Sequence, residues 1–72
     1  MKCSYGNGWT VDYAGPLRIN DGKDVNVFIA ESRLPDDVRS DLEMALFRNS
    51  CSAMKEVADT VTKKYGTRAC IH

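Results

Sequence analysis

The first thirteen residues alternate between apolar and polar side chains on both sides of a glycine-rich turn. The odd positions outside the turn are apolar or aromatic: Met1, Cys3, Tyr5, Trp9, Val11 and Tyr13. Successive strand residues point to opposite faces of a sheet. A three-residue loop at 6–8 gathers these residues on one face and pairs Tyr5 with Trp9, whereas a two-residue loop mixes the faces. The alternation therefore predicts an antiparallel hairpin with one buried face.

A second alternation follows in residues 17–30, LRINDGKDVNVFIA. A loop of three or five residues within 20–24 sets Ile19 beside Val25 and predicts one apolar face carrying Val25, Val27 and Ile29. Phe28 then lies on the opposite face. The pair Gly15-Pro16 interrupts the strand before Leu17 and predicts a bend or bulge there. Residues 1–30 are thus expected to form a three-stranded antiparallel meander.

The second half of the chain has the spacing of two helices. Leu34-Pro35-Asp36-Asp37 has the pattern of a helix start, with Pro at the first helical position. Two apolar stripes follow at helical spacing: Leu34, Val38, Leu42, Ala45 and Leu46, then Met54, Val57, Ala58, Val61 and Tyr65. The second stripe is rotated from the first by more than a right angle, which predicts a break near residues 49–52. Gly66 is the expected end of the second helix.

These elements predict an α+β fold, with the three-stranded meander packed on one face against two helices in the order βββαα. Residues 1–72 are expected to form a single small domain: the meander at 1–30, the helices at 34–66 and a tail at 67–72. Residues 67–72 either add a short edge strand or fray. So small a core gains from further burial, which favours dimerisation.

Charge and length narrow the class of protein. Ten basic and ten acidic side chains cancel, whereas nucleic-acid coats and membrane-surface peptides usually carry excess positive charge. No apolar run is long enough to span a membrane, and Met1 is not followed by a signal-peptide pattern. A cytoplasmic protein without a membrane partner is expected.

The three cysteines favour free thiols over a disulfide framework, because their number is odd. Cys3, Cys51, Cys70 and His72 are candidate zinc ligands, but their spacing lacks the close pairs of structural zinc sites. Nothing in the sequence orients a cysteine–histidine pair for catalysis, and no phosphate-binding or hydrolase motif is present. We therefore expect neither enzymatic activity nor a metal or cofactor.

By elimination, the sequence predicts a protein-binding module. Small proteins of this kind are frequent among phage and mobile-element accessory proteins, which inhibit or modulate a host complex, for example a defence nuclease, by stoichiometric binding. The expected partner is a host or cognate protein. Two surfaces are candidates for its binding: the aromatic residues of the sheet and the acidic residues of the first helix, namely Trp9, Tyr13, Phe28, Asp36, Asp37, Asp41 and Glu43.

An alternative rests on residues 25–65, in which a strand precedes Leu-Pro, a helix, a polar turn and a second helix. This order resembles the ribbon-helix-helix family of DNA-binding regulators. The resemblance implies a dimer in which Val25–Ala30 pairs across the two-fold axis and reads DNA bases. Under this alternative the basic C-terminal third would contact nucleic acid through Arg48, Lys55, Lys63, Lys64 and Arg68.

Overall fold

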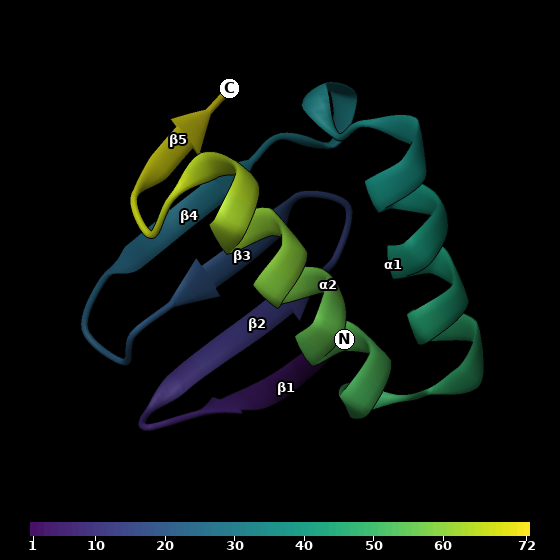
Figure 1. Cartoon of the computed structure of the whole chain (residues 1–72), viewed down its shortest axis with the longest axis horizontal. Coiled ribbons are helices and arrows are strands. Elements are labelled where there is room, and N and C mark those ends of the chain that lie inside the picture. Colours follow the sequence, from purple (N-terminus) through teal and green to yellow (C-terminus); the bar gives the residue numbers. More distant parts are fainter.

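The computed structural model describes the backbone of residues 1–72 and every side chain except that of Tyr5. Two helices cover one face of a five-stranded sheet whose order is β1-β2-β3-β4-β5 (Figure 1). The strands are β1 (Lys2–Gly6), β2 (Trp9–Tyr13), β3 (Leu17–Asn20), β4 (Val25–Ile29) and β5 (Ala69–Ile71). The helices are a short 3-10 turn (Glu31–Arg33), α1 (Asp36–Arg48) and α2 (Cys51–Tyr65). The α+β class is confirmed.

The predicted number of three strands was wrong for two reasons. Residues 14–16 form a complete turn rather than a bulge, because Tyr13 already pairs with Leu17 across β2 and β3. Residues 67–72, expected either to add a short edge strand or to fray, contain the edge strand β5, which pairs in parallel with β4. A parallel pair needs a long crossover, and here the chain makes it through both helices.

The first hairpin keeps the predicted faces at its described side chains but uses a tighter turn; the face predicted for Tyr5 lies outside them. The pairs Cys3–Val11 and Ser4–Thr10 are as predicted, whereas Trp9 pairs with Gly6 and not with Tyr5. Asn7 and Gly8 both have positive φ, at 53° and 82°, as two-residue hairpin turns of the I′ type require. A register shift between Ser4 and Gly6 absorbs the extra residue. The bulge allows a two-residue turn without exchanging the buried and exposed faces.

The second hairpin is shifted by two residues from the predicted register. Leu17 pairs with Ile29 and Ile19 pairs with Val27. A shift of two preserves the faces, so Val27 and Ile29 are fully buried as predicted. Val25 is 51% exposed, contrary to prediction, because it lies at the end of β4 beyond a register irregularity.

Both helices begin and end close to the predicted positions. Pro35 is the N-cap of α1, one residue before its predicted place. The predicted break lies at Asn49, in the left-handed conformation, and at Ser50, whose Oγ accepts a hydrogen bond from the Ala53 N–H at 3.2 Å. The two apolar stripes are buried, except that Leu46 is exposed and Tyr65 half-buried. None of the described helices has the length and apolar character that crossing a bilayer requires.

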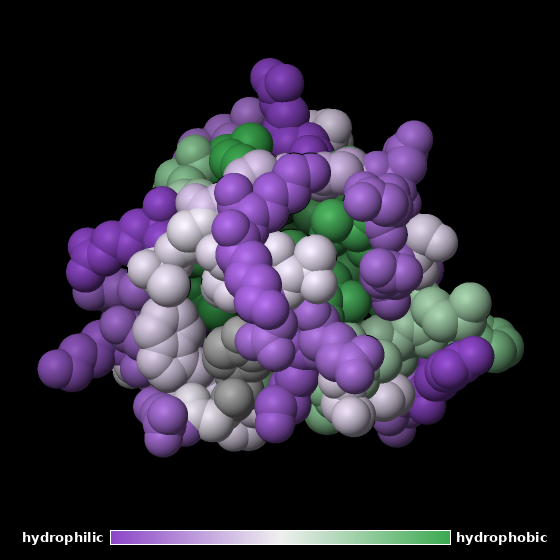
Figure 2. Space-filling view, viewed as in Figure 1, coloured by the Kyte–Doolittle hydropathy of each residue, from purple (hydrophilic) through white to green (hydrophobic). Residues whose placement is uncertain are grey.

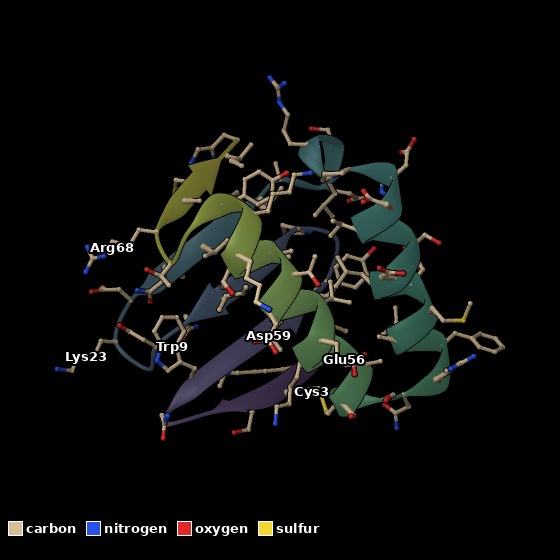
Figure 3. All side chains as sticks on the ribbon, in the orientation of Figure 1. Cys3, Trp9, Lys23, Glu56, Asp59 and Arg68 are labelled. Carbon is tan, nitrogen blue, oxygen red and sulfur yellow. A yellow bond between two sulfur atoms is a disulfide. The ribbon has the colours of Figure 1, made fainter. Side chains whose placement is uncertain are left out.

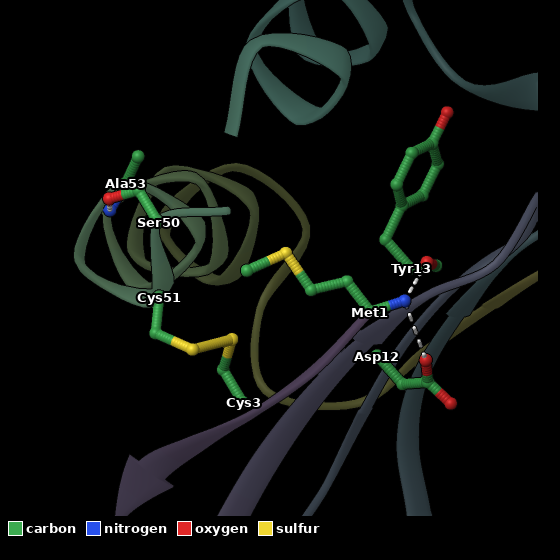
Figure 4. Close-up of a disulfide and its surroundings, with 7 residues drawn as sticks. All are labelled: Met1, Cys3, Asp12, Tyr13, Ser50, Cys51 and Ala53. Carbon is green, nitrogen blue, oxygen red and sulfur yellow. Dashed lines mark hydrogen bonds and ion pairs between the residues drawn. A yellow bond between two sulfur atoms is a disulfide. The ribbon is translucent and has the colours of Figure 1, made fainter. Parts of the chain in front are cut away.

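A disulfide joins Cys3 of β1 to Cys51 at the start of α2, so the prediction of free thiols was wrong for this pair (Figure 4). Their Cα atoms are 5.6 Å apart. The odd count hid the pair because Cys70 remains a free, exposed thiol. Close by, the N-terminal amine of Met1 donates a hydrogen bond to the Tyr13 carbonyl at 2.7 Å, which closes the open end of the hairpin.

Removing the disulfide is expected to cost much of the stability of this fold. The bond closes a loop with a sequence separation of 48, for which loop-closure entropy gives about 4 kcal/mol. Chemical denaturation with and without reductant, and of the Cys3→Ser/Cys51→Ser variant, should show a loss approaching that value. Cys70→Ser, which leaves the bond intact, should unfold as the unaltered protein does. Equal stability with and without reductant would contradict the assignment.

Candidate protein-binding surface

The outer side of α1 carries the most exposed large apolar side chain among the described residues. Phe47 is 89% exposed and Met44 is 51% exposed. At about 100° per residue, Phe47 lies about 200° around the helix from the buried Ala45. It therefore points away from the core. Figure 2 shows this hydrophobic surface at the lower right, over the C-terminal half of α1.

Sequence reasoning missed both residues because it searched for apolar positions that fit a buried stripe. Phe47 follows the stripe residues Leu42 and Ala45 by five and two positions, spacings that place it off their face. The same helical projection, used to find apolar residues that cannot reach the core, would have identified it.

Two depressions meet at Met44. The outer depression has a volume of about 640 Å³ and is lined by Asp36, Arg39, Ser40, Glu43, Met44 and Phe47. The second, here called the α1–α2 groove, has a volume of about 250 Å³ and is lined by Asp41, Met44, Ala45, Arg48, Ala53, Glu56, Val57 and Thr60. Glu56 projects from the N-terminal half of α2 (Figure 3). Met44 therefore joins an apolar surface on α1 to a groove shared by both helices.

Three of the predicted acidic residues border this apolar area: Asp36 and Glu43 line the outer depression and Asp41 lines the α1–α2 groove. Asp36, Asp37, Asp41 and Glu43 are all exposed on α1. The first two lie in the first turn, where the helix dipole stabilises negative charge. That explanation does not extend to Asp41 and Glu43 in the middle of the helix. On α1 four carboxylates stand against two guanidinium groups, so the surface is acidic.

Glu43 also fixes α1 on the sheet. The Tyr13 hydroxyl donates a hydrogen bond to Glu43 Oε1 at 2.7 Å, and Tyr13 is only 5% exposed. Burial, then this hydrogen bond and the charge of Glu43, raise the pKa of Tyr13 to about 12. Beside them, Arg39 donates through Nη2 to the Glu31 carbonyl, while its buried Nε has no hydrogen-bond partner among the described residues. Tyr13, predicted to contact a partner, instead lies between sheet and helix.

The two remaining aromatic candidates lie on opposite faces of the sheet. Trp9 is half-buried against the core under the helices. Phe28 lies on the uncovered face, with the Arg18 guanidinium carbon 5.6 Å from its ring centroid and the His72 ring centroid 5.0 Å away. The structure therefore does not bring the predicted aromatic sheet patch together.

The basic residues of the DNA-binding alternative are all exposed, but they belong to different parts of the fold. Arg48 ends α1, Lys63 and Lys64 lie in the last turn of α2, and Arg68 precedes β5. Lys55 lies near the start of α2. In addition, β4 pairs with β3 on one side and β5 on the other. The strand expected to form an intermolecular ribbon has no free edge.

The bond between Tyr13 and Glu43 predicts a specific dependence of stability on pH. Since the pKa of Tyr13 is raised from 10.0 to about 12 in the fold, the stabilisation is present below pH 10 and is lost as pH rises towards 12. Tyr13→Phe should lower the free energy of unfolding by about 1.5–3 kcal/mol at neutral pH, and the difference should shrink above pH 10. Denaturation at several pH values tests this, with phenolate absorbance reporting the ionisation. A difference that is constant with pH would contradict it.

The described residues offer little for other chemistry at this surface. No three His, Cys, Asp or Glu side chains among them gather as metal ligands, and the disulfide occupies two of the four zinc candidates. The free candidates, Cys70 and His72, lie at β5 and the C-terminus. Comparison with protein-family models, curated proteins and solved structures finds no match to this chain.

Proposed function

We propose that this chain is a non-enzymatic module that binds another protein through the outer side of α1. The observation that carries the proposal is the 89% exposure of Phe47, on the side of the helix opposite the core. Aromatic side chains bury a large apolar area on binding and are frequent anchors of protein interfaces. Met44 extends the apolar area, and polar groups surround it, as in an interface with an apolar centre and a polar rim.

The charge of the surface indicates the kind of partner. Carboxylates outnumber guanidinium groups on α1 by four to two, so a partner with basic residues around an apolar pocket is complementary. A second copy presenting the same side of α1 would oppose acid with acid. We therefore propose a host or cognate protein as the partner, as the sequence suggested, rather than a second copy of this chain.

The biological role within this proposal is the one the sequence suggested. The chain is an accessory protein of a phage or mobile element that inhibits or modulates a host complex by stoichiometric binding. One rigid helix with an aromatic anchor is sufficient for such a role, because occupying a pocket on the target blocks that pocket to other ligands.

Replacing Phe47 should abolish partner binding without unfolding the protein. Affinity capture with the unaltered chain, Phe47→Ala and the matched control Leu46→Ala should recover a stoichiometric partner with the first and third only. The affinity of Phe47→Ala should fall by about 30-fold or more. Its free energy of unfolding should stay within about 0.5 kcal/mol of the unaltered protein's, since the side chain lies outside the core. Equal capture by both variants would refute the role of Phe47.

The compartment has a direct chemical test. The sequence suggested the cytoplasm, where reducing systems keep most cysteine pairs as thiols, whereas Cys3 and Cys51 are joined by a disulfide. Thiols trapped with maleimide in intact cells, then counted by mass after denaturation, should show modification of Cys70 alone. Modification of all three cysteines would show that the disulfide is reduced in the cell, as expected in the cytoplasm.

A further inference from the structure

We propose, resting on the proposed function, that the partner contributes a basic amphipathic helix that lies along the α1–α2 groove above Met44. The groove supplies the apolar floor and the acidic rim, and Met44 joins it to the outer depression that Phe47 lines. The sequence did not predict this site, since it assigned binding to the aromatic residues of the sheet and the acidic residues of α1, without α2.

The backbone chemistry of the groove selects a helix over an extended peptide. Extended peptides usually gain affinity by adding a strand to a free sheet edge, where main-chain hydrogen bonds form. The groove lies between two helices, whose main-chain groups are already paired within each helix. A partner segment placed there must satisfy its own main-chain groups, as a helix does.

The shape and composition of the groove fit such a helix. Two adjacent helices leave a furrow into which the side-chain ridges of a third can pack. The lining residues 41–48 of α1 give it a length of roughly 10 Å, at 1.5 Å per residue. Ala45 and Val57 are buried in its floor. With Met44 above them, they form an apolar strip that suits anchors at i, i+3, i+4 and i+7 of a partner helix.

The charges at the rim of the groove determine which charge the partner helix must carry. Asp41 of α1 and Glu56 of α2 line the groove against the single cation Arg48. Asp37, one turn before Asp41, is also exposed and adds a further negative charge. Basic residues flanking the apolar anchors are therefore complementary, whereas an acidic helix would be repelled.

The test uses two synthetic helical peptides that share the same leucine anchors and differ only in their flanking residues, lysine in one and glutamate in the other. Fluorescence anisotropy with the folded, disulfide-bonded protein should show binding of the lysine peptide and at least about tenfold weaker binding of the glutamate peptide. The preference should diminish between about 0.05 M and about 0.5 M NaCl, because salt screens exposed charges.

Matched charge reversals separate the groove from general attraction to an acidic protein. Glu56→Lys changes the groove, and Asp24→Lys makes the same change of charge in the exposed β3–β4 loop. The lysine peptide should lose about tenfold or more in affinity with Glu56→Lys and keep its affinity with Asp24→Lys. Equal losses, or no preference between the peptides, would overturn the inference. In that case loss of captured partner with Phe47→Ala would leave the proposed function standing, so the two can fail separately.

Discussion

The disulfide between Cys3 and Cys51 is the constraint on which the arrangement of the two layers depends. It joins the edge strand β1 to the first residue of α2, so the start of α2 is held over one edge of the sheet. The chain must then turn at Asn49 and Ser50, directly before that point. As Figure 1 shows, α2 crosses the sheet and α1 lies beside it. One side of α1 is left without protein cover as a result.

The direction in which α1 presents its side chains follows from two further contacts. Val38, Leu42 and Ala45 are buried against the rest of the core, and the Tyr13–Glu43 hydrogen bond fixes the rotation of the helix about its axis. Once these positions are occupied, the remaining sides are determined by the helical period. No rotation of α1 about its axis would bury Phe47 without exposing Leu42.

The parts of the fold that the sequence predicted are those that depend on local periodicity. Alternation identified the buried faces of both hairpins, and the rotation between apolar stripes located the helix break without a Gly or Pro. A bulge before Gly6 and the shift of the second hairpin escaped prediction because several registers preserve the same faces. The parallel β4–β5 pair and the disulfide join residues that are distant in sequence, so no local sequence pattern predicts these pairings. Of the proposed binding surface, the sequence predicted the acidic residues but not Phe47, because its exposure depends on where the core lies.

Stability and the proposed binding are separable on α1 because they depend on different sides of the helix. The buried side holds the fold, and the side with Arg39 and Glu43 contacts the 3-10 turn and the sheet. The third side, with Ser40, Met44 and Phe47, makes no contribution to the core and is exposed. The Phe47 ring stays exposed when the chain folds, so burying it in a complex would add hydrophobic stabilisation to binding alone. Glu43 is the exception, because it belongs both to the acidic surface and to the bond with Tyr13.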